Sequence, residues 1–288
     1  MRFLVLGGNS FLGREFVNTL VREDKEFLQV SKTGREGCKK LDIFDLDLFT
    51  ETLDSFRPNI VVNFAWFTSR KNYTTSEENW RYYKNSLDIY SLLNTYKVER
   101  YVGIGSGSEY GEVGSFAAGF SKLNPRSIYA QAKAKTFQEL LALSKNSYTK
   151  LSWARVFQPF GIGQHIECFI PSVIRSLRLG LNYKVTNPHR GLDWIHISDI
   201  ASGLMMGIAI GLLEFDLGTG KVNTNEEIFR YLSHFSQDGE FQQDTISDSL
   251  FSQEANSLSV AGNSPLVTSG AWTPKIDLFS ELSKLYFS

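Results

Sequence analysis

The fold of this 288-residue chain is decided by the stretch GGNSFLG, residues 7–13. It follows a short apolar run, residues 3–6, and leads into residues 13–21, where apolar side chains recur at helical spacing. Glycines permit the tight turn and close backbone approach that a dinucleotide's pyrophosphate requires, and the following helix offers its backbone N–H groups. A turn without a ligand is the alternative, but its place in a first strand–helix unit favours a dinucleotide site. The predicted cofactor contacts here are Gly7, Gly8, Ser10, Phe11, Leu12 and Gly13.

Strand-like and helix-like segments alternate outward from this stretch. The run at 59–64 is apolar and rich in β-branched residues, which is typical of a central parallel strand. The alternation predicts an α/β fold, a Rossmann-type doubly wound parallel sheet with helices on both faces. The further predicted strands are 27–30 and 101–104, and the predicted helices are 47–56, 76–96 and 129–143.

The regular alternation of strand-like and helix-like segments ends after Phe157. Glycine and proline interrupt short segments there, and residues 237–270 are rich in Ser, Gln, Asn and Asp. We therefore expect residues 1–157 to form the NAD(P)-binding Rossmann domain, which the chain rejoins at about 190–220. Residues 158–288 are predicted to be mainly a smaller substrate-binding region.

Composition excludes several classes of function. The chain has 30 basic and 31 acidic residues, for a net charge of -1, and so lacks the electrostatic footprint of a nucleic-acid-binding protein. Its apolar stretches fall short of the roughly 20 residues that span a bilayer, and no secretory signal is recognisable, so we expect a cytoplasmic location. The two distant cysteines, Cys38 and Cys168, are predicted to be buried thiols, and the four scattered histidines indicate no metal site.

The end of the second predicted strand bears on which dinucleotide binds. An acidic residue there would read the free ribose hydroxyls of NAD, whereas this chain has Ser31, Lys32 and Arg35. Basic side chains suit the 2′-phosphate of NADP, and a serine hydroxyl can hydrogen-bond it. Solvated loop charges are the alternative. The segment favours NADP, with NAD as the alternative cofactor.

Tyr129 and Lys133 are four residues apart in a predicted helix, which places both side chains on one face. An ammonium group stabilises a nearby phenolate and would lower the pKa of the tyrosine, making it a general acid or base. Such a pair is also common on solvated helices. Ser106 favours chemistry, because it follows a predicted parallel strand at the sheet edge where ligands of open α/β sheets bind.

These segments together resemble the extended short-chain dehydrogenase/reductase (NAD-dependent epimerase/dehydratase) family, particularly its nucleotide-sugar epimerases and reductases. The resemblance covers nearly the whole chain in the expected order. It is carried by the motifs GGNSFLG, NFAW, GSGSEYG, YAQAK, RVFQPFGIGQ and LDWIHISDIASG.

The resemblance implies roles for particular residues. Ser106, Tyr129 and Lys133 would be the catalytic triad: the tyrosine exchanges a proton with the sugar, the lysine holds the nicotinamide ribose and the serine orients the reacting oxygen. It also implies cofactor contacts along the adenine and dinucleotide path, from Asp42, Ile43, Phe64, Ala65, Trp66 and Asn85.

The chain departs from the family pattern at positions that narrow the chemistry. Ser10 replaces the middle glycine of the phosphate loop and is small enough to permit binding. Gly107 and Ser108 stand where sugar-nucleotide 4,6-dehydratases usually carry Asp-Glu, and Ser108 stands near the cysteine position of GDP-fucose synthase-like enzymes. With both sets of groups missing, the residues support simple hydride transfer.

The substrate end also departs from the family. Gln158 stands where many relatives have an asparagine that contacts the nucleotide diphosphate. Leu192 stands where many relatives have an arginine, and Arg190, two residues earlier, is the arginine that could replace it. We expect Gln158, Arg190, Ser106 and Ser108 to contact substrate. Four further residues could form a sugar platform, a surface on which a pyranose ring packs, although ordinary helix and loop packing explains them equally well. They are Trp66, Arg70, Tyr73 and Trp80.

The function expected from sequence is an NADP-dependent reductase of a nucleotide-linked 4-keto-6-deoxy sugar. The alternative is a nucleotide-sugar 4-epimerase that retains its NAD(P), and a non-catalytic dinucleotide-sensing regulator is the third reading. The resemblance also implies a homodimer, formed through the helix at 76–96 and the helix that carries Lys133.

Overall fold

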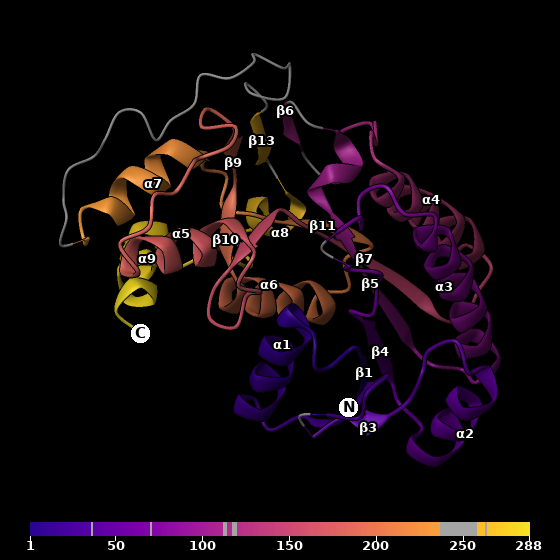
Figure 1. Cartoon of the computed structure of the whole chain (residues 1–288). Helices are drawn as coiled ribbons and strands as arrows, with labels where there is room; N and C mark the ends of the chain where they lie inside the picture. Colours follow the sequence, from indigo (N-terminus) through magenta and orange to yellow (C-terminus); the bar gives the residue numbers. More distant parts are fainter. Residues whose placement is uncertain (36, 70, 112–113, 117–119, 237–257, 263) are drawn as a thin grey trace.

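A sheet of seven parallel strands forms the centre of the molecule (Figure 1). The computed structural model describes residues 1–288 apart from 36, 70, 112–113, 117–119, 237–257 and 263. The strand order is β11-β7-β5-β4-β1-β2-β3, as in a Rossmann-like fold, which confirms the α/β prediction. In chain order these strands are β1 (Arg2–Leu6), β2 (Glu26–Ser31), β3 (Lys39–Lys40), β4 (Ile60–Asn63), β5 (Arg100–Ser106), β7 (Lys150–Val156) and β11 (Glu214–Leu217).

Alternating side chains of the strands pack on two helical layers. Phe3 and Val5 of β1 face a core shared with α1 (Phe11–Arg22) and α6 (Ile197–Ala209). Leu4 and Leu6 face the opposite core, shared with α2 (Leu46–Phe56), α3 (Glu78–Thr95) and α4 (Ile128–Ser144). Because both faces are covered, the central strands β1 and β4 are largely apolar, as buried parallel strands are.

Polar caps set where the helices begin. Ser10 caps α1 by accepting a hydrogen bond from the Gly13 N–H, so the helix starts at Phe11, before its apolar pattern becomes regular. Asp45 caps α2 and Ser127 caps α4 in the same way. The Ser127 cap places Tyr129 in the first turn of α4 and Lys133 one turn later.

The strands differ from the expected ones at the site. β5 extends to Ser106, so the serine is the last residue of a strand rather than part of the following turn, which is the 3₁₀ helix η1 (Gly107–Tyr110). β7 lies beside β5 and was not among the predicted strands, because Ser152 and a buried arginine, Arg155, interrupt its apolar residues.

A third core, which includes Phe160, Trp194 and Phe229, lies in the later part of the chain. The helices around it are α5 (Phe169–Arg178), α7 (Asn225–Ser233) and α9 (Leu278–Phe287), and Figure 1 shows them on the side away from α2 and α3. The short helix α8 (Pro265–Thr268) packs against β11. Two small sheets complete this part, built from β8 (Gln158–Phe160) with β10 (Trp194–His196), and from β6 (Gly114–Phe116), β9 (Gly191–Leu192), β12 (Asn223–Thr224) and β13 (Leu258–Ala261).

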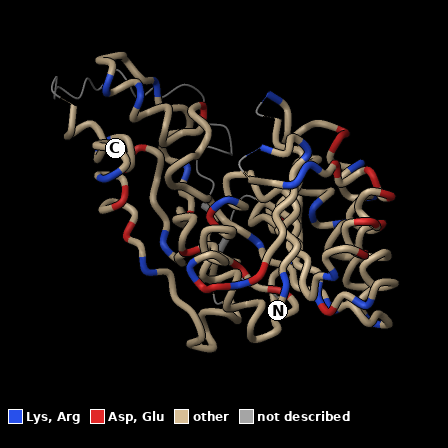
Figure 2. The backbone as a smooth tube through the Cα atoms, turned by 90° about the horizontal axis from the view of Figure 1, so that it is seen from below, with Lys and Arg blue, Asp and Glu red and all other residues tan. Residues whose placement is uncertain are grey.

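Basic and acidic residues are interspersed along the backbone, consistent with the nearly balanced charge (Figure 2). Among the residues that the structure describes, no helix combines the length and apolar character needed to cross a membrane. Cys38 and Cys168 are both buried thiols that form no disulfide with each other, as the sequence predicts.

Candidate active site

The glycine stretch lies where the strand order reverses, at the carboxyl end of β1 between β2 and β4. Gly7 has a φ of +75°, a conformation that favours glycine, and a Cβ there would lie 2.9 Å from the Ala65 nitrogen. A Cβ on Gly13 would lie 2.3 Å from the Gly7 carbonyl oxygen. The backbone thus forms a cradle without side chains at the amino terminus of α1, which fits a pyrophosphate group.

The other residues of the predicted cofactor path lie beside this cradle. Phe64 and Ala65 directly follow β4 and flank Gly7. Asn85 of α3 donates a hydrogen bond to the Ile43 carbonyl at 2.8 Å, while its Oδ1 is buried and has no partner among the described residues. Asn85 therefore lies beside Ile43, and its unsatisfied oxygen is consistent with a ligand that donates a hydrogen bond.

The segment after β2 places two predicted cofactor residues in contact with each other. Lys32 Nζ lies 3.1 Å from Asp42 Oδ2; the lysine side chain is largely solvent-accessible, whereas that of Asp42 is partly buried. Ser31 is buried, and its hydroxyl accepts a hydrogen bond from the Gly34 N–H at 3.1 Å. Arg35 is exposed on the same loop. The basic residues expected at a 2′-phosphate are therefore present, although the charge of Lys32 is partly balanced by Asp42.

Ser106, Tyr129 and Lys133 come together at the carboxyl end of β5. Lys133 Nζ donates to the Ile104 carbonyl oxygen at 2.6 Å and lies 5.9 Å from the centre of the Tyr129 ring. The same ammonium lies 3.7 Å from the centre of the Trp66 ring, which places this aromatic residue of the predicted cofactor path beside Lys133. The arrangement joins a hydroxyl, a phenol and an amine at the edge where ligands of such sheets bind.

Burial dominates the protonation of this cluster. It raises the pKa of the Tyr129 phenol, and Tyr73 raises it further, while a hydrogen bond with Ser106 acts in the opposite direction. The sequence-based expectation that Lys133 lowers the pKa of Tyr129 is therefore wrong for the cofactor-free protein. Burial lowers the pKa of Lys133 itself from 10.5 to about 7, against the attraction of Glu109.

The position directly after Ser106 has little room for an acidic side chain. A Cβ on Gly107 would lie 3.0 Å from the Phe157 ring. Ser108 is close enough to Ser106 for a hydrogen bond, with 2.8 Å between the two Oγ atoms. Ser108 is thus placed to orient the Ser106 hydroxyl, and Gly107 is required by the packing of Phe157.

The conceivable sugar platform is only partly assembled around these residues. The Tyr73 ring packs edge-on against Tyr129 with 5.4 Å between centres, and the Tyr129 N–H donates to the Thr74 carbonyl. Trp80 instead packs against Tyr83 within α3. Arg70 lies outside the described residues.

The predicted diphosphate contacts lie in the later part of the chain. Gln158 is the first residue of β8 and its N–H donates to the Asp193 carbonyl, which ties β8 to the segment before β10. Arg190 is exposed and immediately precedes β9. The structure describes no direct contact between these two side chains and the cluster around Tyr129.

Sequence reasoning missed a buried carboxylate beneath Ser106. Glu109 is 0% exposed, and its Oε1 accepts the Ser106 N–H at 2.8 Å. Its Oε2 accepts from Arg155 Nε, also at 2.8 Å. An arginine inside the otherwise apolar stretch Ser152–Phe157 was the available signal, because a buried cation requires a buried partner.

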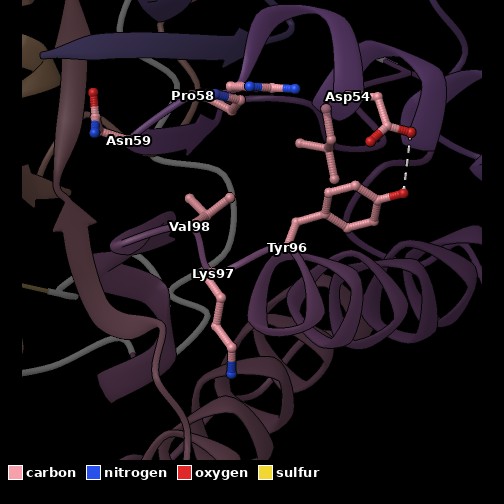
Figure 3. Close-up of a pocket in the computed structure, with 8 residues that line it drawn as sticks. Asp54, Pro58, Asn59, Tyr96, Lys97 and Val98 are labelled. Carbon is pink, nitrogen blue, oxygen red and sulfur yellow. Dashed lines mark hydrogen bonds between the residues drawn. The ribbon is translucent and has the colours of Figure 1, made fainter.

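A cavity of about 270 Å³ lies elsewhere, at the ends of α2 and α3 (Figure 3). Its lining includes Pro58 and Val98, which precede β4 and β5, and a hydrogen bond from Tyr96 to Asp54 closes one side. This is the amino edge of the sheet, opposite to the edge where ligands of such folds bind. The described residues also contain no group of three His, Cys, Asp or Glu side chains that could hold a metal ion.

Comparison with known proteins agrees with this arrangement. The model of the NAD dependent epimerase/dehydratase family matches residues 3–209. A dTDP-glucose 4,6-dehydratase of an Actinoplanes species is 25% identical over 262 residues, which cover 81% of each chain. A dTDP-glucose 4,6-dehydratase of Mycobacterium tuberculosis is 26% identical over 221 residues, 69% of this chain and 66% of the other.

Solved structures share the fold over the whole chain. UDP-glucose 4-epimerase of Thermotoga maritima, solved with UDP-glucose, superposes with a TM-score of 0.86 at 20% identity, covering 100% of this chain and 98% of the other. The dTDP-glucose 4,6-dehydratase of Bacillus anthracis, in complex with NAD, gives a TM-score of 0.81 at 19% identity, covering 100% and 96%.

Proposed function

Because the chain belongs to the NAD dependent epimerase/dehydratase family of enzymes, we propose that it reduces a nucleotide-linked 4-keto-6-deoxy sugar with NADPH. The observation that carries this proposal is the cluster of Ser106, Tyr129 and Lys133, joined without an acidic side chain at Gly107 or Ser108. Elimination of water requires an acid and a base besides the tyrosine, whereas reduction of a ketone requires a single proton donor.

The residues of the chain support each part of that reduction. When bound, the nicotinamide supplies the hydride that the carbonyl carbon receives. Tyr129 holds its proton at neutral pH, because burial raises its pKa, and would deliver that proton to the carbonyl oxygen. Ser106 would orient the same oxygen by a hydrogen bond, and Lys133 would hold the nicotinamide ribose. Gln158 and Arg190 are proposed to contact the nucleotide diphosphate.

The protonation of Tyr129 favours reduction over epimerisation. A 4-epimerase uses the tyrosine first as a base, which requires a phenolate, whereas a reductase uses it as an acid. A raised pKa supports the acid role. The absence of an acidic residue at Ser31, together with Lys32 and Arg35, supports NADPH as the donor.

The proposal is tested by incubating the purified protein with dTDP- and UDP-linked 4-keto-6-deoxy sugars and either NADPH or NADH. We expect a fall in reduced-cofactor absorbance, an equimolar product two mass units heavier than the substrate, and faster turnover with NADPH. The control is Tyr129→Phe, which removes the proton donor while leaving the ring in place.

One observation favours the 4-epimerase as the second candidate. The ion pair between Lys32 and Asp42 reduces the positive charge offered to a 2′-phosphate, which suits NAD. An epimerase would interconvert 4-hydroxy epimers of a nucleotide sugar without consuming NADPH. That result would replace the reductase by the epimerase.

The proposed assembly is a homodimer. α3 and α4 pack side by side on one face of the sheet, where the resemblance places a four-helix interface (Figure 1). Size-exclusion chromatography with light scattering should give about twice the chain mass of 32.6 kDa. A mass of one chain at micromolar concentration would contradict this.

A further inference from the structure

A buried ion pair lies directly beneath Ser106. Both oxygens of Glu109 accept hydrogen bonds: Oε1 from the Ser106 N–H, Oε2 from Arg155 Nε, and both from Trp153 Nε1 at 3.2 Å. The Glu109 side chain is 0% exposed and that of Arg155 is 1% exposed. Because Glu109 faces Arg155 and the sheet, it cannot take the place of the acidic pair that dehydratases carry at the two preceding positions.

Arg155 is held rigidly near the carboxyl end of β7. Its guanidinium lies between the rings of Tyr110 and Phe137, 4.9 and 4.5 Å from their centres. Its Nη1 also lies 2.8 Å from Glu214 Oε2 on the neighbouring strand β11. A buried ion pair is costly to desolvate, and well-packed apolar residues often serve stability equally well. Stability alone therefore does not account for the pair.

The hydrogen bond that the Ser106 N–H donates to Glu109 fixes the backbone of this serine. Ser106 and Glu109 form a capping box at the start of η1, in which each side chain accepts from the backbone of the other end. The Ser106 side chain also meets Ser108 at 2.8 Å. The direction of the Ser106 hydroxyl is thus set by a carboxylate that itself is locked to Arg155.

The Glu109 charge also acts on Lys133. The groups facing the Lys133 ammonium are Tyr129 of its own helix, the Trp66 ring after β4, the Ile104 carbonyl of β5 and Glu109 of η1. Of these, the carboxylate is the one whose negative charge opposes the effect of burial on the lysine pKa.

We propose that Glu109, locked by Arg155, is a positioning residue that orients Ser106. Its negative charge is expected to act on Lys133 as well. The inference rests on the proposed roles of Ser106 and Lys133 in catalysis. It assigns to η1 a carboxylate that touches no substrate yet sets both the geometry and the pH dependence of the site.

The first experiment needs no substrate. Glu109→Gln retains an acceptor for the Ser106 N–H but removes the charge, and Glu214→Gln is the matched control because it removes a partner of the same arginine without contacting Ser106. Lysine labelled with ¹³C at Cε is titrated by NMR in the cofactor-free protein, and Lys133→Met identifies the resonance. We expect the Lys133 midpoint, about pH 7 in the unaltered protein, to fall by about 0.5 unit or more in Glu109→Gln and to stay within about 0.2 unit in Glu214→Gln.

The second experiment separates position from charge. Glu109→Asp keeps the charge but is one methylene shorter, so it should leave the Lys133 midpoint nearly unchanged. In the reductase assay, kcat of Glu109→Asp should fall about 10-fold or more while KM changes little, because the Ser106 hydroxyl is misplaced. Glu214→Gln should keep both constants within about 2-fold. Because the titration requires no turnover, failure of the proposed reaction and failure of this inference give different results.

A double variant serves as the control for a single variant that fails to fold. If Glu109→Gln alone does not fold, Glu109→Gln combined with Arg155→Met removes both charges and fills the space between the two rings. A fall in the Lys133 midpoint is still expected, smaller than for the single change because the positive charge of Arg155 is lost as well. An unchanged Lys133 midpoint in the folded charge-removing variant, or an equal fall in Glu214→Gln, would overturn the proposal and leave the pair a purely structural feature.

Discussion

Replacing Lys133 by Met tests how much the burial of the protonated lysine destabilises the folded protein. The side chain is 5% exposed, and burial lowers its pKa from 10.5 to about 7. At about 1.36 kcal/mol per pKa unit, this displacement corresponds to a cost of about 5 kcal/mol for the protonated form in the folded chain. The cost applies at and below pH 7, where the unfolded chain carries the full charge.

The sign follows from proton linkage. Between pH 7 and 10.5 the unfolded chain binds more protons at Lys133 than the folded chain, so the free energy of unfolding rises with pH. The free energy of unfolding of the protein with Lys133 should rise by about 3 kcal/mol between pH 7 and about pH 9.5. Lys133→Met has no such proton to bind. The variant should therefore be the more stable protein at pH 7, with the difference shrinking as the pH rises.

The assay is urea unfolding of both proteins without cofactor at several pH values in this range, followed by tryptophan fluorescence and circular dichroism. The quantity of interest is the difference in unfolding free energy between the two proteins, because titrations common to both cancel. Stability curves that stay parallel from pH 7 to pH 9.5 would refute the reasoning, since Lys133 would then titrate alike in the folded and unfolded chains.

Three further predictions concern the cofactor and the reaction. Gly13→Ala places a methyl group 2.3 Å from the Gly7 carbonyl oxygen, so it should cost about 1–3 kcal/mol of stability and weaken NADPH binding about 10-fold or more by calorimetry. Gly207→Ala, whose Cβ would lie 2.4 Å from an aromatic ring of β11, should destabilise without changing NADPH affinity; an equal loss of affinity would speak against the cradle. Lys32→Ala should weaken NADPH binding about 10-fold and leave NADH binding nearly unchanged, and equal effects on both would argue against a 2′-phosphate site. Tyr129→Phe should lower kcat about 100-fold or more with cofactor affinity preserved, whereas unchanged turnover would exclude the tyrosine as proton donor.

Several features of the molecule could be predicted from local sequence alone. The glycine stretch at 7–13 fixes a strand–turn–helix unit, because glycine, the Ser10 cap and the apolar periodicity act over a few neighbouring residues. The spacing of four places Tyr129 and Lys133 on one face of α4, since helical geometry depends only on that spacing. Ser106 could also be placed from local sequence, because it comes at the carboxyl end of a short apolar run that forms a buried strand.

The energies of the charged groups could not be predicted in this way, because they depend on burial and on partners that are distant in the chain. Lys32 forms an ion pair with Asp42, and this pair partly neutralises the positive charge of Lys32 at the proposed cofactor site. Glu109 meets Arg155 only because β7 lies beside β5. The sequence thus determined which chemical groups the chain brings to one edge of the sheet. The tertiary structure alone decided their protonation and orientation, since both are set by desolvation and by contacts between strands far apart in sequence.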